Sequence, residues 1–204
     1  SLNSPTSAPT SSDVAFKLPN ADGTSGQAIV TDASGNLSFA SKGKILQVVA
    51  TNITATSSVS VTNASLANTP ATVTITSVAA NSKFIVSGTI SGEGTLNPHT
   101  VGFVLRRVIG GSGSSINVGD SSGNRNSLSF MHSTSYYDND QDSTPSTNVL
   151  SPYLDSPNQA AGTAITYKIA VMGLGTGGTY YFGRTVVDSN SADYERLPNN
   201  ITVM

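Results

Sequence analysis

Cysteine and tryptophan are both absent from this chain of 204 residues, and charge of either sign is scarce. Without cysteine, no disulfide can stabilise a small module of the chain. Only 11% of the residues are charged, against about a quarter in an average protein. The net charge is −2 and there is no basic run, so the chain lacks the electrostatic footprint of a nucleic-acid-binding protein. No run of about 18 apolar residues is present, so membrane insertion is not expected.

Helical periodicity is missing as well, because no window carries apolar residues at the i, i+3, i+4 and i+7 spacing. Period-two alternation recurs instead from residue 45 to residue 204, which argues against disorder. Clusters of Gly, Asn, Asp and Pro separate the alternating runs. Roughly ten strands in about 160 residues predict an all-β protein with an antiparallel β-sandwich, and a jelly roll is the favoured topology.

Several predicted strands have a clear apolar face. These faces are Ala71/Val73/Ile75, Phe84/Val86/Gly88/Ile90, Val101/Phe103/Leu105 and Ile165/Tyr167/Ile169/Val171. Later strands are predicted at residues 149–154, 165–172, 179–187 and 200–204. Residues 1–10 carry neither the basic start nor the apolar block of a signal peptide. The sequence ends at Met204, directly after the strand-like run Ile201-Thr202-Val203. We therefore expect the natural chain to continue beyond Met204.

The segment from Leu18 to Ala40 holds two short apolar runs, each introduced by a glycine-containing turn. A unit of this length buries almost nothing by itself, because isolated hairpins are marginally stable and chains below about 40 residues usually need staples or partners. We expect it to wrap against identical copies from other chains. The predicted organisation is a linker or the end of an upstream shaft over residues 1–13, a fibre shaft or neck β module over 14–43, and a C-terminal β-sandwich head over 44–204.

Apolar residues occupy both faces of the run from Ile45 to Val49. Because successive side chains of a strand point to opposite faces, one face can pack inside the sandwich and the other against a neighbouring subunit. A homotrimer is the predicted assembly, since a shaft of three wrapped chains requires a head with threefold symmetry.

Two groups of motifs give the chain a family likeness. The first group is Leu18-Pro19-x-Ala21-Asp22-Gly23-Thr24-x-Gly26-Gln27 and Thr31-Asp32-x-x-Gly35-x-Leu37-Ser38-Phe39. The second group is Ile45-Leu46-Gln47-Val48-Val49, Gly119-Asp120-x-x-Gly123-x-Arg125 before Ser129-Phe130, Tyr153-Leu154-Asp155-Ser156-Pro157, Thr166-Tyr167-Lys168-Ile169 and Ile201-Thr202-Val203-Met204. In this order the motifs resemble the C-terminal shaft-plus-head region of bacteriophage tail fibres and related virion fibre proteins. The resemblance implies a trimeric, β-rich distal domain of the virion that meets the host surface.

The densest acidic run directly follows a pair of tyrosines. We predict receptor binding here, because tyrosine rings are large, stiff and amphipathic, which suits both sugar stacking and protein recognition. The candidate residues are Tyr136, Tyr137, Asp138, Asp140 and Asp142. The three aspartates are also candidates for a metal site, but the helix–loop–helix calcium pattern fails, because Ser143 replaces its glycine and Val149 its glutamate. An exposed, charge-solubilised loop is the alternative, and no cofactor is expected.

No catalytic residues are predicted. Glycoside hydrolysis normally needs two carboxylates about 5–9.5 Å apart, and the only glutamates, Glu93 and Glu195, lie beside turns. Asp188 and Asp193 join Glu195 in the one remaining acidic cluster, beside Tyr194. A Gly-x-Ser-x-Gly nucleophile elbow is absent from the sequence.

The remaining polar motifs are expected to be structural. Two separate histidines, His99 and His132, do not make a zinc site without cysteine or a third histidine. Residues 119–123 are predicted to form a tight turn, with Asp120 and Arg125 as a local ion pair. In the pair Arg106-Arg107, one side chain faces outward and the other needs a carboxylate, which a neighbouring subunit could supply.

The function favoured by these features is attachment of a virus to a host cell. The partners would be a host surface glycan or outer-membrane protein, together with upstream fibre or other virion proteins. One alternative is a purely structural cap that registers three chains at the fibre end or decorates a capsid. A second alternative is a glycan-degrading enzyme of the tailspike kind.

Overall fold

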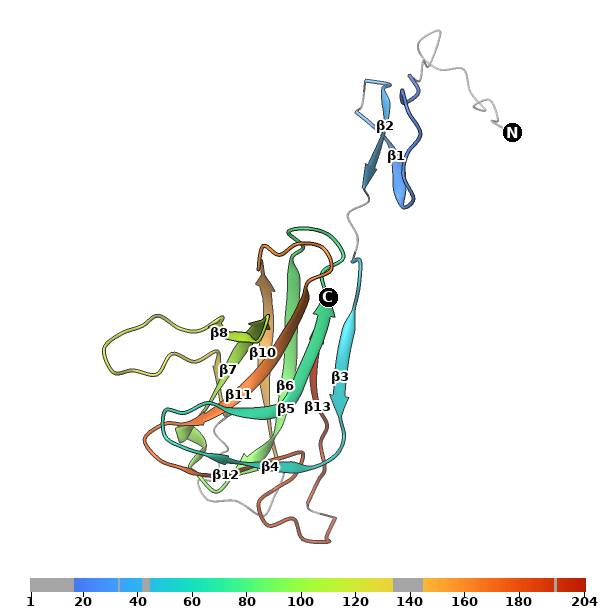
Figure 1. The fold of residues 1–204 in the computed structure, drawn as a ribbon. Helices are drawn as coiled ribbons and strands as arrows, with labels where there is room; N and C mark the ends of the chain where they lie inside the picture. The colour runs from blue at the N-terminus through green and yellow to red at the C-terminus, as the bar shows by residue number, and fades with distance from the viewer. Residues whose placement is uncertain (1–16, 33, 42–44, 134–144, 193) are drawn as a thin grey trace. The chain divides into compact units, whose positions relative to one another are not determined.

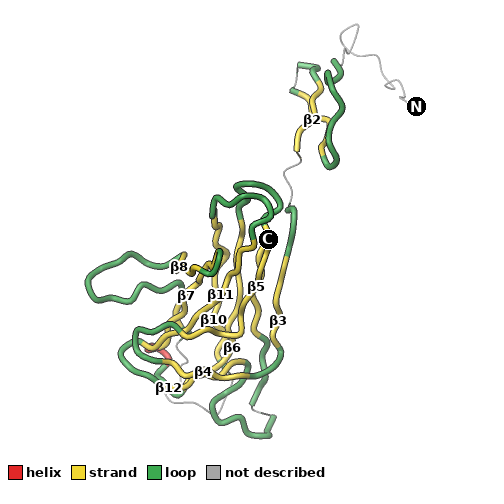
Figure 2. Tube along the Cα trace, viewed as in Figure 1, coloured by secondary structure: helices red, strands yellow, loops and turns green. Residues whose placement is uncertain are grey.

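The computed structural model describes residues 17–32, 34–41, 45–133, 145–192 and 194–204. The chain divides into two compact units, residues 1–45 (the leader unit) and residues 46–204 (the head unit). The described parts are built almost entirely from β-strands, and their one helical element is the 3-10 turn Pro98–Thr100 (Figures 1 and 2). Within these ranges, no helix has the length and apolar character needed to cross a membrane.

The leader unit is a β-hairpin. Its two strands, β1 (Gln27–Thr31) and β2 (Leu37–Ser41), pair antiparallel with Ile29 opposite Phe39. Lys17 adds a single parallel bridge to the start of β2. Every residue of this unit whose burial is described is at least partly exposed to solvent. The described hairpin therefore has no core of its own.

The hairpin turn is closed by Asp32. Its carboxylate accepts hydrogen bonds from the Asn36 side-chain amide at 2.6 Å and from the Ser34 backbone N–H at 2.8 Å. These two hydrogen bonds lower the pKa of Asp32. Gly35, between the two donors, has a φ of 86°, a conformation that glycine adopts without steric cost.

Two antiparallel sheets form the head unit (Figure 1). The first sheet runs in the order β3-β13-β6-β12-β4, and β10 pairs with β6 along its other edge. The second sheet runs in the order β5-β11-β7-β8, with the short β9 pairing to β7. The first-sheet strands are β3 (Val49–Ile53), β4 (Ser57–Val61), β6 (Phe84–Gly94), β10 (Ser146–Asp155), β12 (Gly178–Phe182) and β13 (Asn199–Val203). The second-sheet strands are β5 (Ala67–Thr76), β7 (Val101–Ile109), β8 (Ser112–Ile116), β9 (Phe130–Met131) and β11 (Ala164–Gly173).

The strand order is that of a jelly roll. With β4, β9 and β12 set aside as additional strands, one sheet reads β3-β13-β6-β10 and the facing sheet reads β5-β11-β7-β8. The chain alternates between the sheets in the way that two Greek keys produce. The predicted fold class, an all-β antiparallel sandwich, is confirmed. The predicted homotrimer stays a prediction.

The core lies between the two sheets and is rich in aromatic rings. Tyr180 contacts Phe103 edge to face with a centroid distance of 5.7 Å, and it packs on Phe182 at 5.1 Å. All four apolar faces expected from the sequence are buried. The outward-facing Thr74 and Thr76 of β5 are exposed, so the alternation predicted for this strand is confirmed.

Two glycine-dependent turns differ from the sequence-based expectation. The strand predicted at residues 179–187 ends at Phe182, because Gly183 has a φ of 74° and turns the chain into a loop that reaches residue 198. At the other turn, Gly110 and Gly111 have φ values of 57° and 85°, which suit a two-residue type I′ hairpin. The glycine-rich run Gly110-Gly111-Ser112-Gly113 predicts a turn of four residues, but residues 112 and 113 belong to β8.

A buried polar triad links the two sheets. Asp155 lies at the end of β10, while Arg107 on β7 and Tyr167 on β11 face it from the other sheet. Arg107 Nη1 donates to Asp155 Oδ1 at 2.7 Å, and the Tyr167 hydroxyl donates to Oδ2 at 2.7 Å. The Asp155 side chain is only 4% exposed, so these contacts replace its lost hydration. Burial, together with this carboxylate, raises the pKa of Tyr167 and keeps its hydroxyl protonated.

The expectation for the arginine pair is confirmed. Arg107 finds its carboxylate, and the carboxylate belongs to the same chain. Arg106, on the opposite face of β7, donates to the carbonyl of Gly113 on the neighbouring strand at 2.9 Å.

Replacing Asp155 by alanine should lower the free energy of unfolding by about 3 kcal/mol, because the change leaves the Arg107 charge and the Tyr167 hydroxyl without their partner. Equilibrium urea denaturation measures this loss. Asp120→Ala, on an exposed loop, is the matched control and should change the stability by less than about 0.5 kcal/mol. Equal stabilities of the two variants would show that the triad does not stabilise the sandwich.

Candidate functional site

The five predicted receptor-binding residues lie outside the described residues. They are Tyr136, Tyr137, Asp138, Asp140 and Asp142. The metal site considered for the three aspartates lies outside them too, so both ideas stay predictions. The structure does describe the two positions from which this segment departs, Ser133 after β9 and Pro145 before β10.

A polar cluster that is buried apart from Ser133 holds the first of these positions. It consists of His132, Ser133, Asn148 and Tyr180, and we call it the loop base. The backbone N–H of His132 donates to the Val101 carbonyl at 3.0 Å, which extends the pairing of β9 with β7. The backbone N–H of Ser133 donates to Asn148 Oδ1 at 2.5 Å. The end of β9 is thereby fastened to the start of β10.

Asn148 is the central residue of the loop base. It is almost fully buried, and its side-chain Nδ2 donates to the Ile90 carbonyl at 2.9 Å and to the Tyr180 hydroxyl at 3.3 Å. One side chain thus joins β10 to β6, β12 and the end of β9. A buried amide whose donors and acceptor are all used fixes the position of its neighbours, so the segment between Ser133 and Pro145 starts from a rigid support.

His132 is a neutral member of the loop base. Its ring packs edge to face on Tyr180 with a centroid distance of 5.7 Å. Nδ1 lies 2.8 Å from the Ser133 carbonyl, which can only accept, so Nδ1 carries the proton. Burial lowers the pKa of His132, against the opposite effect of the Ser133 and Gly92 carbonyls. Burial also raises the pKa of Tyr180, so the cluster is uncharged at neutral pH.

Sequence reasoning did not single out Asn148, although a signal was present. Asn148 and Leu150 occupy alternate positions, so they share one face of the strand, and Leu150 is a core residue. A polar residue at an inward position is an informative observation, because buried polar groups are nearly always hydrogen-bonded.

The carboxylates considered for glycoside hydrolysis position the loop over residues 183–198. Asp188 pairs with Arg196 at 2.7 Å and with Arg184 at 3.7 Å. Glu93 Oε2 accepts from the backbone N–H of Val186 at 3.0 Å. Glu195 is exposed, and the fourth carboxylate considered, at position 193, lies outside the described residues. Asp188 therefore pairs with arginines of the loop, and Glu93 holds the loop backbone at Val186.

The other polar motifs are surface features. His99 is exposed in the 3-10 turn. The expected ion pair between Asp120 and Arg125 is wrong: both residues are described, and Arg125 Nη1 instead donates to the hydroxyl and carbonyl of Ser122 at 3.0 and 3.3 Å. Ser122 lies three residues before Arg125, so its hydroxyl and carbonyl are within reach of the Arg125 side chain. Across the described ranges, no three His, Cys, Asp or Glu side chains gather closely enough to hold a metal ion.

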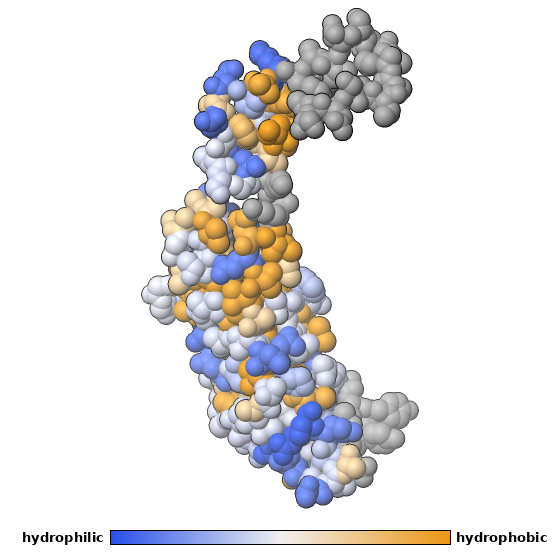
Figure 3. All heavy atoms as spheres, turned by 90° about the vertical axis from the view of Figure 1, so that its right-hand side faces the viewer, coloured by the Kyte–Doolittle hydropathy of each residue, from blue (hydrophilic) through white to orange (hydrophobic). Residues whose placement is uncertain are grey.

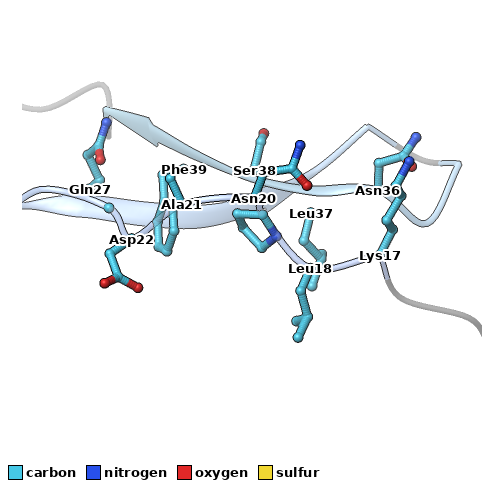
Figure 4. A pocket seen from close by; sticks show the side chains of 12 residues that line it. Lys17, Leu18, Asn20, Ala21, Asp22, Gln27, Asn36, Leu37, Ser38 and Phe39 are labelled. Atoms are coloured by element: carbon cyan, nitrogen blue, oxygen red, sulfur yellow. The ribbon is translucent and has the colours of Figure 1, made fainter.

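The leader unit carries a shallow groove along one side of its hairpin (Figure 4). Leu18, Leu37 and Phe39 supply its largest apolar side chains. Leu18 is 71% exposed. The Phe39 ring lies so close to Gly23 that a Cβ there would clash with it. The groove is an apolar surface that this hairpin cannot cover by itself.

Comparison with known proteins leaves the family open. No protein-family model matches the chain, and no curated protein sequence matches it. Among solved structures, the chain is similar to the structure of the Gx strain of infectious bursal disease virus, with 10% identity and a TM-score of 0.38 over 86% of this chain. For the Gt strain the values are 12%, 0.29 and 85%. The chain spans about 40% of the length of each matched structure. Both overlays are loose, so we argue function from this chain's own residues.

The loop base should lose stability in acid because of His132. Its folded-state pKa lies below the ordinary value of about 6.5, so the unfolded chain takes up the proton first as the pH falls. As the pH falls from about 7 to about 5, the protein should lose more unfolding free energy than the His132→Gln variant. Denaturant titrations across this range measure the difference, and His99→Gln serves as the exposed control. Parallel curves for the protein and His132→Gln would contradict the assignment.

Proposed function

We propose that this chain is a structural protein of a virus particle, namely the C-terminal part of a homotrimeric fibre. The leader unit forms the end of the shaft, and the head unit is the distal domain that attaches the virion to a host-cell surface. The partners on the host side are a surface glycan or an outer-membrane protein. Upstream fibre or other virion proteins are the partners on the virus side.

The observation that carries this proposal is the leader unit without a core. None of its residues with described burial is buried, while Leu18 is 71%, Ile29 59% and Val30 38% exposed. A two-stranded hairpin of this kind is marginally stable at best in water. Three hairpins wrapped about a common axis supply one another with the missing core, which is the construction of a fibre shaft.

The head unit supports the attachment role through its loop base. Recognition segments work best when a rigid scaffold presents them, and the buried Asn148 binds the backbone of Ser133, where the tyrosine-containing segment begins. Aromatic and polar side chains on such a loop are suited to sugars and to protein surfaces. Three copies on one fibre would compensate for a weak single site through avidity.

The oligomeric state gives the first test of the fibre proposal. Sedimentation velocity should give a trimer of about 62 kDa, which is three times the chain mass of 20.8 kDa. Deleting residues 1–45 should weaken association at least tenfold, because the uncovered apolar residues of the hairpin are then lost. A folded full chain that remains a 20.8 kDa monomer at all concentrations would refute the proposal.

Adsorption gives the second test. The double variant Tyr136→Ala/Tyr137→Ala should bind susceptible cells at least tenfold less than the unchanged fluorescent protein, while remaining trimeric. Ser58→Ala/Ser60→Ala, on the exposed face of β4, is the control and should bind normally.

Three further results would change this interpretation of the head unit. Unchanged binding by the tyrosine variant would discard that loop as the receptor site. An intact trimer that binds no susceptible cell would favour the structural cap. Release of reducing ends from host polysaccharide would favour the glycan-degrading alternative.

A further inference from the structure

On the outer face of β6, Glu93 lies at one end, opposite Tyr181 of β12. The rest of this outer surface, from Thr89 to Ile85 of β6 and across β3, β13 and β10, carries no charged side chain. All of its residues are described, and they form rows that cross the sheet in register. The rows are Asn52–Asn200–Thr89–Val149, then Ala50–Thr202–Ser87, then Val48–Met204–Ile85–Leu154. We call the last of these the apolar row. Asp155, the charged residue of β10, points inward to the triad.

The apolar row is well defined by backbone pairing. Ile85 exchanges both backbone hydrogen bonds with Met204, at 2.8 and 3.0 Å, and pairs directly with Leu154 on its other side. Val48 precedes Val49, which pairs with Val203, and so continues the row across β3. Neighbouring strands lie about 4.8 Å apart, so these four residues follow one another in a line across the sheet.

The row is open to solvent in the isolated chain. Val48 is 57%, Leu154 55% and Ile85 39% exposed, and Ile45 and Leu46, just before the row, are 64% and 54% exposed. Figure 3 shows apolar side chains gathered at the end of the head unit where β3 begins and β13 ends. Single exposed apolar residues are common on protein surfaces, but a contiguous apolar patch marks an interaction surface.

We infer that this surface is the contact between copies of the head unit, and that the apolar rows of three chains meet at the threefold axis. The inference rests on the proposed trimeric fibre and assigns the face that the trimer uses. It commits to a second copy of this chain as the occupant of the surface.

Charge is the first argument for a second copy. Burying an unpaired charge at an interface is costly, and about a quarter of the residues of an average protein are charged. A foreign partner would therefore bring charges that this face cannot neutralise. Another copy of the three rows brings only apolar side chains, threonines, serines and asparagines, whose hydroxyl and amide groups can bond to one another across the contact.

Chain continuity is the second argument. Four residues, 42–45, separate the end of β2 from Leu46, and a residue spans at most about 3.6 Å. If three leader units wrap together, each must be followed within this short reach by its own Leu46 and Val48. The covalent chain therefore keeps the start of the apolar row of every copy close to the threefold axis of the leader units.

Cysteine labelling tests the assignment at single positions, because the chain has no cysteine of its own. Leu154→Cys lies in the apolar row, and Val187→Cys, 48% exposed in the native chain, lies on the β12–β13 loop as a matched control. In the full-length trimer, a maleimide should react with Leu154→Cys at least tenfold more slowly than with Val187→Cys. The two rates should become equal in denaturant. Equal rates in the assembled protein would overturn the inference and leave the fibre proposal standing.

A charge insertion tests the same surface by its energetics. Ile85→Glu/Leu154→Glu places three pairs of carboxylates at the axis and should raise the trimer dissociation constant at least tenfold, whereas Val187→Glu should not. Both sites face outward, so circular dichroism should show unchanged folding. A dissociation constant unaffected by the double change would also overturn the inference. A monomeric unchanged protein would instead remove the fibre proposal itself, and this inference with it.

Discussion

The two-faced character of a β-strand is the constraint on which the head unit depends. A sandwich of two sheets can bury only one face of each strand, so every second residue must be apolar and must point inward. Val86 and Val203 meet this demand and are fully buried. The same constraint leaves the other face of every strand free to vary, and the two sheets use that freedom differently. β5 exposes threonines such as Thr74, whereas the facing sheet exposes the apolar row.

Local alternation explains why much of the fold could be predicted from the sequence. A period of two is visible within five residues, and the runs at residues 71–76 and 165–169 carry it without interruption. Their burial depends on that local pattern, and the structure confirms it. Strand ends were predicted less well, because they depend on the backbone angle of one residue. Gly183 stops β12 where the side-chain pattern alone would have continued it.

The polar interior could be predicted only in part, because its contacts join residues far apart in the chain. The need of Arg107 for a carboxylate follows from its inward position, but nothing local identifies Asp155, forty-eight residues later, as the partner. Asn148 is a similar case, since its bonds to Ile90 and Tyr180 depend on how three strands are ordered in one sheet. Such contacts become visible only once the jelly-roll order is known. For the predicted receptor loop, the structure describes the loop base that supports it, which centres on Asn148.

Scarcity of charge connects the two uncovered apolar surfaces of this chain. Charged side chains are the usual protection against nonspecific association, and this chain has a net charge of only −2. A monomer would expose the leader groove and the apolar row with few charges to keep copies apart. The proposed trimer covers both surfaces through one threefold axis, because the hairpin and the apolar row follow each other along the chain. Uncharged serine, threonine and asparagine then suffice on the outside, since the surfaces that most need protection are no longer exposed. On this view the low charge is a consequence of assembly, and the outer face of one sheet is as much a part of the folded state as the core between the two.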